Sequence, residues 1–213
     1  MEQLFRTYKL CAVFRDTPQE YFPDYVQAAY DGGVRIFEVA MNGAGAAAQI
    51  SYLHDIYGDS VHVGAGTSIT LERCRDAKAA GADFLLTPST SRTILDFAAE
   101  NSMPILPGVM SPTDVSVCLE YGIKTLKLFP AGDLPPHFIK SLKGPFDGTE
   151  YVAVGGVRPD NAPEFLRRGF IGVGIGGNLL PKEVVQGRRW DEARTLIGQL
   201  ADSMNVTVKS PGV

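Results

Sequence analysis

Short apolar segments alternate with amphipathic segments along the chain. The apolar segments have the length and composition typical of strands, and the segments between them have the periodicity of helices with one buried face. The predicted strands are Leu10–Phe14, Val34–Val39, His62–Ala65, Phe84–Thr87, Ile105–Pro107, Thr125–Phe129, Tyr151–Val154 and Ile171–Ile175. Their starts recur about every 25 residues, the length of a minimal strand-plus-helix unit. The pattern predicts an α/β fold, a single (β/α)₈ TIM barrel, with an open doubly wound sheet as the second possibility.

Residues typical of helix ends support this alternation. Thr17–Glu20 and Ser111–Asp114 each have the pattern of a capping box with proline at the first helical position. Gly32-Gly33 and Gly81 stand where helices usually end. Trp190–Met204 reads as a closing helix. We therefore expect one domain over residues 1–213, with a tail from about residue 205 that is poorly tied down.

Composition and charge exclude several classes of function. The 213 residues are 45% hydrophobic and 21% charged, with a net charge of −4, so nucleic acid is not an expected partner. The N-terminal segment lacks the apolar core of a signal peptide, and no apolar run approaches the roughly 18 residues of a membrane span. The cysteines, Cys11, Cys74 and Cys118, show no CxxC spacing and are expected to be buried free thiols. These features favour a soluble cytoplasmic protein without a membrane partner.

Lys127 is the most informative single residue. It lies in a predicted strand between apolar neighbours, on the face shared by Thr125 and Phe129. A barrel strand is covered on both faces, and lysine is rarely buried without a reason. Burial favours the neutral amine that attack on a ketone requires. The alternative is a lysine at a strand end that reaches solvent or pairs with an acid.

Glu38 strengthens the catalytic interpretation. It lies in the apolar strand around Ile36 and Ala40, and both charged positions fall on even-numbered strands, the second and the sixth. Alternate strands supply the same layer of a barrel interior, so Glu38 and Lys127 are predicted to share one layer. They form either a structural ion pair or a nucleophile with its proton shuttle.

Glycine clusters follow the last two predicted strands. Gly155 and Gly156 end the seventh strand, and Gly176 and Gly177 follow the eighth. Backbone N–H groups there can approach an anion, and these loops form the usual phosphate site of such barrels. The alternative is that the glycines only permit tight turns. The segment Gly172–Gly177 also matches GxGxxG, but no further strand follows it, which argues against a dinucleotide site.

Weaker signals lie at the ends of other strands. Thr67 can offer a hydroxyl group to a carboxylate, Pro88 closes the fourth strand, and Arg15 follows the first strand. Arg15 is equally well explained as a solvated surface residue. The three histidines are dispersed without metal-ligand spacing, so we expect neither a metal nor another cofactor.

These residues together resemble the 2-keto-3-deoxy-6-phosphogluconate / 4-hydroxy-2-oxoglutarate aldolase family over nearly the whole chain. The matching stretches are Gly32–Val39, Val63–Thr67, Leu106–Val109, Leu126–Pro130 and Val154–Val157. The resemblance implies a class I aldolase that cleaves a 2-keto-3-deoxy-6-phospho sugar acid to pyruvate and glyceraldehyde 3-phosphate. It also implies a homotrimer without metal.

The resemblance further implies roles for individual residues. Lys127 would form the Schiff base with the substrate ketone, and Glu38 would shuttle protons. Thr67 would hold the pyruvyl carboxylate. Pro88 and Phe129 would line the pocket, and the substrate phosphate would bind the loops at Gly155, Gly156, Gly176 and Gly177.

Three positions depart from the phosphogluconate-specific pattern. Asn42 stands where that group has an arginine that holds the carboxylate, Val154 replaces a threonine, and Gly177 replaces a serine. The first two resemble the 6-phosphogalactonate aldolases of the same family. Three alternatives remain: a 4-hydroxy-2-oxoglutarate aldolase of the same family, a phosphosugar isomerase or epimerase on a similar barrel, and a barrel that only binds a sugar acid.

Overall fold

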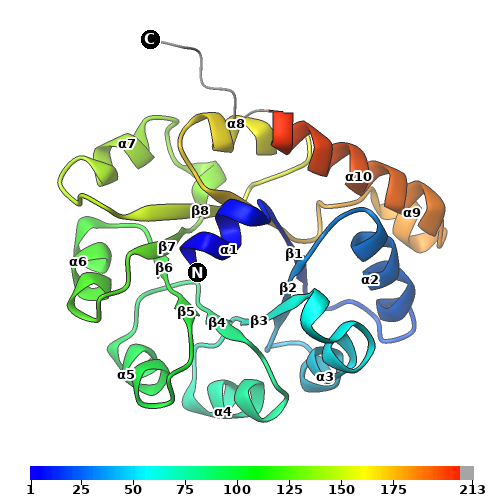
Figure 1. The fold of residues 1–213 in the computed structure, drawn as a ribbon, viewed down its shortest axis with the longest axis horizontal. Helices are drawn as coiled ribbons and strands as arrows, with labels where there is room; N and C mark the ends of the chain where they lie inside the picture. The colour runs from blue at the N-terminus through cyan, green and yellow to red at the C-terminus, as the bar shows by residue number, and fades with distance from the viewer. Residues whose placement is uncertain (207–213) are drawn as a thin grey trace.

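The structure, a computed structural model, describes residues 1–206 and is built around parallel strands (Figure 1). The strand segments in the described residues are β1 Leu10–Phe14, β2 Ile36–Ala40, β3 His62–Gly66, β4 Phe84–Leu86, β5 Ile105–Leu106, β6 Gly108–Val109, β7 Thr125–Leu128, β8 Glu150–Val154 and β9 Gly172–Ile175. They coincide with the predicted strands to within about two residues at most ends, except that the fifth is divided.

The divided fifth strand closes the barrel. The hydrogen-bonded order is β5-β4-β3-β2-β1-β9-β8-β7-β6, so β5 and β6 form the two ends of the sheet. These two segments are separated only by Pro107, which has no N–H to donate to a sheet. Its carbonyl oxygen still accepts a hydrogen bond from Lys127 N at 2.9 Å. Because one continuous stretch of chain pairs on both sides, the predicted (β/α)₈ barrel is confirmed, and an open doubly wound sheet is excluded.

Helices α2 to α10 surround the barrel in a ring, and α1 lies over the barrel inside that ring (Figure 1). The helices of the described residues are α1 Glu2–Thr7, α2 Phe22–Asp31, α3 Ala46–Tyr57, α4 Leu71–Ala79, α5 Arg92–Glu100, α6 Pro112–Glu120, α7 Phe138–Lys143, α8 Ala162–Arg167, α9 Lys182–Gln186 and α10 Trp190–Val206, with 3₁₀ turns at Gly58–Ser60 and Ala131–Asp133. The predicted closing helix is α10, which continues to Val206. The remainder of the predicted tail, residues 207–213, lies outside the described residues.

One of the two predicted capping boxes is present. Asp114 N donates to Ser111 Oγ, and the Asp114 carboxylate accepts from Ser111 N, so α6 begins as expected. The prediction for Thr17 was wrong, because residues 19–21 form a turn and α2 begins at Phe22. The Thr17 carbonyl instead accepts a hydrogen bond from Gln49 Nε2 of α3. A tertiary contact has replaced the local cap.

The apolar core has two layers. The larger layer lies between the strands and the outer helices and includes Leu126 and Leu128. The smaller layer fills the barrel interior and includes Phe5, Cys11 and Ile36. Alternate residues of each strand therefore face opposite layers, as the pleat of a strand requires.

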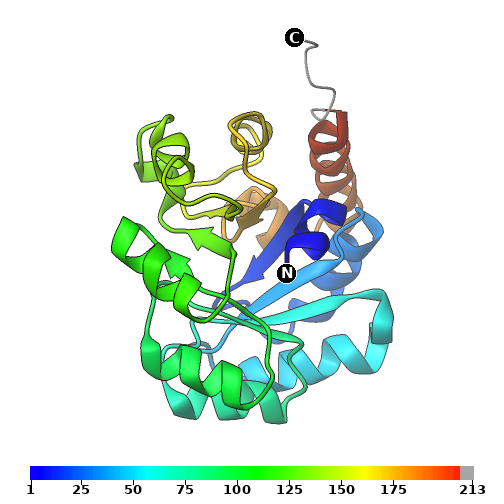
Figure 2. The same ribbon diagram turned by 60° about the vertical axis from the view of Figure 1, so that its left-hand side comes forward.

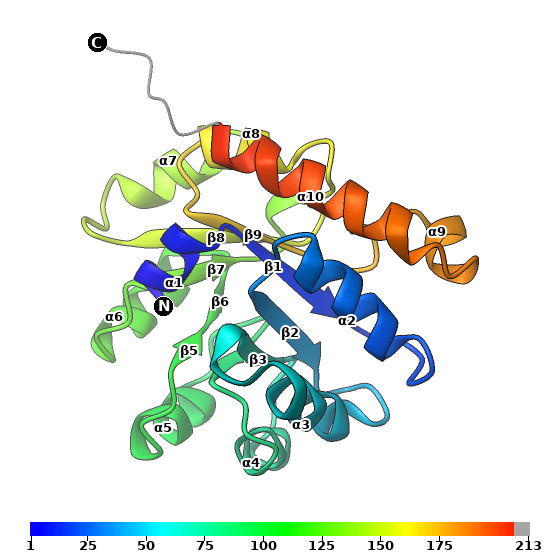
Figure 3. The ribbon, with the colours of Figure 1, turned by 45° about the vertical axis from the view of Figure 1, so that its right-hand side comes forward.

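Helix α1 lies across the amino end of the barrel, a position visible in Figures 2 and 3. Its Phe5 is fully buried, and a Cβ added to Gly172 at the start of β9 would lie 2.7 Å from Phe5 Cδ1. The glycine therefore makes room for the phenylalanine ring. This packing places α1 opposite the carboxyl ends of the strands, where active sites of such barrels occur.

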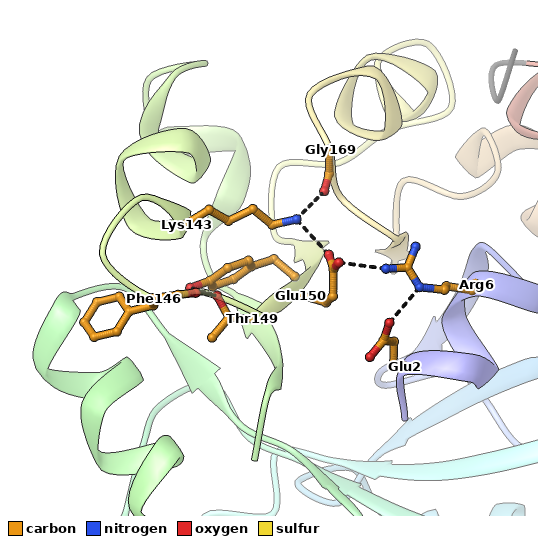
Figure 4. A network of polar contacts seen from close by, with 8 residues as sticks. Glu2, Arg6, Lys143, Phe146, Thr149, Glu150 and Gly169 are labelled. Carbon is orange, nitrogen blue, oxygen red and sulfur yellow. Dashed lines mark hydrogen bonds and ion pairs between the residues drawn. The ribbon is translucent and has the colours of Figure 1, made fainter. Parts of the chain in front are cut away.

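A polar network fixes α1 to neighbouring elements (Figure 4). Arg6 donates to Glu2 at 2.8 Å and to Glu150 at 2.7 Å, and Lys143 donates to the second oxygen of Glu150 at 2.7 Å. Lys143 also donates to the carbonyl of Gly169. Glu150 of β8 thus joins α1 to α7, and Lys143 of α7 extends the network to the turn before β9.

The predicted buried free thiols are confirmed for Cys11, Cys74 and Cys118. Burial raises the pKa of each thiol, that of Cys118 to about 11. Within the described residues, no helix has the length and apolar character needed to cross a membrane.

Candidate active site

Lys127 and Glu38 meet inside the barrel. Lys127 Nζ lies 3.9 Å from Glu38 Oε1, and the two residues are only 5% and 1% exposed. The neighbours of Lys127 in β7, Leu126 and Leu128, belong to the outer core, which leaves Lys127 facing inward. The prediction that Lys127 and Glu38 lie in the same layer of the barrel interior is therefore confirmed.

The two groups are close without being hydrogen-bonded. A separation of 3.9 Å exceeds the usual N–H···O distance. Glu38 Oε2 is buried and has no hydrogen-bond partner among the described residues. A buried carboxylate oxygen without a partner is unfavourable by about 1–3 kcal/mol or more, which argues against a purely structural pair. The arrangement leaves the carboxylate able to accept a proton from a bound molecule.

Gly66 provides the space that Glu38 occupies. A Cβ built on this glycine would lie 2.0 Å from Glu38 Oε1. Gly66 is the last residue of β3 and pairs with Ala40 of the adjacent β2. The sequence analysis gave this glycine no steric role. The pairing of neighbouring strands was the signal that could have revealed its steric role.

Cys11 of β1 is a further buried neighbour that sequence reasoning did not place at the site. Its thiol pKa is raised chiefly by burial and additionally by the Glu38 carboxylate, while Lys127 acts in the opposite direction. The thiol therefore lies within the electrostatic reach of both charged residues.

Arginine side chains converge on Thr67 at the carboxyl end of the barrel. Arg15 Nη2, from the end of β1, contacts Thr67 Oγ1 at 3.4 Å. Arg73 Nη1, from α4, donates to the Thr67 carbonyl at 3.2 Å. Arg15 and Thr67 are thus brought together, and Arg73 is a neighbour that sequence reasoning missed. Asn42 follows β2, is exposed and makes no hydrogen bond with a described side chain.

Phe129 lies between the lysine and the first glycine loop. Lys127 Nζ is 5.4 Å from the centre of its ring, within the range of a cation–π contact. A Cβ on Gly155 would lie 2.9 Å from the same ring. Pro88 lies two residues after the end of β4, and its backbone would lie 2.4 Å from a Cβ on Gly108. Pro88 is thus tightly packed against β6.

The glycine loops have conformations that favour glycine. Gly155 and Gly156 have φ values of +85° and +69°, and Gly156 lies against Gly132. The backbone N–H groups of Gly155, Gly156 and Gly177 donate to no acceptor among the described residues. Gly177 has open space where a Cβ would stand, and Gly176 lies beside Val13. These loops therefore have free donors at the barrel mouth. Among the described residues, no three His, Cys, Asp or Glu side chains gather as a metal site.

Comparison with known proteins decides the family. The family described as KDPG and KHG aldolase matches residues 1–196. The chain belongs to the KDPG and KHG aldolase family. The resemblance expected from the sequence is confirmed, and so is the enzyme class, an aldolase acting as a lyase.

Curated relatives and solved structures agree with this assignment. A 2-dehydro-3-deoxy-6-phosphogalactonate aldolase of Escherichia coli (strain K12) is 32% identical over 172 residues, 80% of this chain and 83% of the relative. A 2-dehydro-3-deoxy-phosphogluconate aldolase of Haemophilus influenzae is also 32% identical, covering 80% of each chain. The structure of a KDPG aldolase from Legionella pneumophila, with pyruvate captured as a covalent carbinolamine, superposes with a TM-score of 0.84 at 26% identity, covering 93% of this chain and 97% of that one.

Proposed function

We propose that the protein is a class I aldolase that cleaves a 2-keto-3-deoxy-6-phospho sugar acid to pyruvate and glyceraldehyde 3-phosphate. The observation that carries the proposal is a lysine amine 3.9 Å from a carboxylate, both buried inside the barrel. A structural ion pair would satisfy both partners, whereas Glu38 Oε2 is unpaired among the described residues. The family and its relatives support the same reaction class.

The reaction begins at Lys127. Its neutral amine attacks C2 of the ketone and forms a carbinolamine. Glu38 moves protons between the lysine nitrogen and the departing hydroxyl group, and water leaves to give an iminium ion. The 3.9 Å separation leaves the carboxylate beside the nitrogen without a hydrogen bond that would occupy the amine.

Cleavage uses the iminium as an electron sink. Glu38 removes the proton of the C4 hydroxyl, the C3–C4 bond breaks, and its electron pair passes to C3 as an enamine while C4 leaves as the aldehyde. Glu38 then returns its proton to C3. Water hydrolyses the resulting iminium, which releases pyruvate and restores the lysine amine.

The barrel mouth holds the two ends of the substrate. Thr67 and Arg15 bind the carboxylate, since a hydroxyl and a guanidinium already meet there. Asn42 follows the adjacent β2 and offers a neutral amide near this end. Pro88 and Phe129 line the space between. The loops at Gly155, Gly156, Gly176 and Gly177 bind the phosphate through backbone N–H groups.

The assembly and location form part of the same proposal. We expect a homotrimer in the cytoplasm, and three buried free thiols fit a reducing compartment. Sedimentation equilibrium measures the mass of the assembly. A monomeric mass at the enzyme concentration used in the activity assay would contradict the trimer.

The proposal is tested by trapping with pyruvate and borohydride. Reduction of the iminium fixes a three-carbon adduct on Lys127, which intact-mass measurement and peptide mapping locate. Activity should fall with the extent of the adduct, and a chelator should leave it unchanged. Lys124 lies three residues away and serves as an internal control. An adduct on Lys124 alone, or none, would contradict the mechanism and favour an isomerase or a binding protein.

A further inference from the structure

The first turn of helix α4 contains Glu72 and, directly after it, a cation, Arg73, at a position where a helix favours an anion. The N-cap of α4 is Thr70, whose hydroxyl accepts a hydrogen bond from Arg73 N at 3.3 Å, so Arg73 is the third residue of the helix. The macrodipole favours acidic side chains there, as with Asp114 in α6. Arg73 forms no ion pair with an acidic side chain in the described part of the chain. Its position therefore needs another explanation.

The guanidinium of Arg73 reaches back to the loop that precedes its own helix. Nη1 donates to the carbonyl of Thr67 at 3.2 Å, and the same carbonyl accepts from Ile69 N at 2.9 Å. Arg73 is only partly exposed, so this contact is shielded from solvent. The Arg73 side chain thus links α4 to the start of the loop that precedes it. The first residue of this loop is Thr67, whose hydroxyl lies at the barrel mouth.

Thr67 has a backbone conformation that requires such support. Its φ is +56°, in the left-handed region that β-branched residues rarely adopt. Conformations of this kind persist where surrounding contacts fix them, and they concentrate at binding sites. Arg73 contacts the backbone of Thr67, while Arg15 contacts its hydroxyl. Two cations on one threonine, without an acidic partner among the described residues, leave positive charge that suits an anion.

We propose that Arg73 is a positioning residue for binding of the substrate carboxylate. It holds Thr67 in place through the Thr67 carbonyl. Its guanidinium also adds positive charge near the proposed carboxylate site, whereas the neutral side chain of Asn42 adds none. This inference rests on the proposed function, in which Thr67 and Arg15 bind the carboxylate of a 2-oxo acid. Arg73 itself contacts Thr67 and not the substrate.

Arg73→Met tests the inference, because methionine keeps an apolar stem but loses the charge and the donor. Arg75→Met is the matched control: Arg75 is exposed on the same helix and makes no hydrogen bond or ion pair within the described residues. In Arg73→Met, the pyruvate concentration for half-maximal borohydride trapping should rise about tenfold, the scale of a lost charged hydrogen bond. Trapping at saturating pyruvate should change by less than about threefold, because Lys127 and Glu38 are untouched.

A second measurement does not depend on activity. Hydrogen exchange of the Ser68 and Ile69 amides should accelerate in Arg73→Met and remain at the wild-type rate in Arg75→Met. Arg73→Lys keeps the charge and a donor, so it should fall between wild type and Arg73→Met in both measurements. Equal exchange and equal pyruvate dependence in the two methionine variants would overturn the inference, as would a lysine variant no better than methionine. Failure of the wild type to trap pyruvate would instead refute the proposed function, and exchange would still decide whether Arg73 positions Thr67.

Discussion

Glu38 depends on the absence of a side chain at Gly66. Its carboxylate oxygen lies 2.0 Å from the position that a Cβ on this glycine would occupy. A methyl group there must displace either the carboxylate or β3, and β3 is hydrogen-bonded on both sides. At the scale of single residues, the site therefore depends as much on a missing side chain as on the two charged groups.

We expect Gly66→Ala to lower turnover by about 10²-fold or more, because a misplacement near 1 Å in a catalytic group has this effect. In Glu38→Gln, turnover should fall by a similar factor, which is the usual effect of removing an acid–base group, and the fold should be kept. Steady-state kinetics and circular dichroism measure both. Gly43→Ala is the control, since its nearest contact would be an ordinary 3.5 Å. Unchanged turnover in a folded Glu38→Gln would show that Glu38 is structural.

At the scale of elements, α1 contributes to the stability of the barrel at the end opposite the candidate active site. Phe5 fills the amino end of the barrel, and Arg6 fixes the helix to Glu150. Lys127 lies in the interior toward the opposite, carboxyl end. Loss of the Phe5 ring should therefore weaken the fold without altering Lys127 and Glu38.

We expect Phe5→Ala to reduce the free energy of unfolding by about 3–5 kcal/mol, the usual cost of deleting a buried phenylalanine. Urea unfolding followed by circular dichroism measures it. Ile56→Ala is the control, because Ile56 is 56% exposed, and it should change stability far less. Turnover of the folded Phe5→Ala enzyme should stay near that of the wild type. A cost no larger than that of the control would show that α1 does not seal the barrel.

At the scale of the whole molecule, the proposed function makes the mouth of the barrel the part that selects the substrate. Val154 is buried at the carboxyl end of β8, directly before the loop proposed to bind phosphate, and Asn42 follows β2. Both differ from the phosphogluconate-specific pattern. Val154 offers no hydroxyl to a substrate hydroxyl, so the epimer that needs this partner leaves a polar group unpaired.

We predict a preference for the phosphorylated galactonate-type acid over its gluconate-type epimer, with kcat/KM higher by about tenfold, the scale set by one unpaired buried group. Val154→Thr should shift the ratio toward the gluconate epimer, and the unphosphorylated acids should react poorly. A coupled assay for pyruvate measures all four substrates. A strong gluconate preference in the wild type would refute the epimer assignment, and equal rates on unphosphorylated acids would refute the phosphate site.

The sequence by itself determined the fold class, the alternation of elements and the two charged positions. Hydrophobic periodicity is local, so it can be read without knowing the partners of each strand. Lys127 and Glu38 were recognisable because charged residues in apolar strands conflict with their surroundings. The capping box at Ser111 was equally local, and the structure contains it.

Only the tertiary structure decided the features that join distant segments. The helix expected at Thr17 begins at Phe22, and Gln49, 32 residues away, holds the Thr17 carbonyl. The space at Gly66 depends on the neighbouring strand, and the role of Arg73 depends on where the loop at Thr67 folds back. Such features depend on atoms far apart in the chain, and local pattern carries no information about distance between them. The barrel brings them within a few ångströms because closure at Pro107 fixes every strand beside its neighbours.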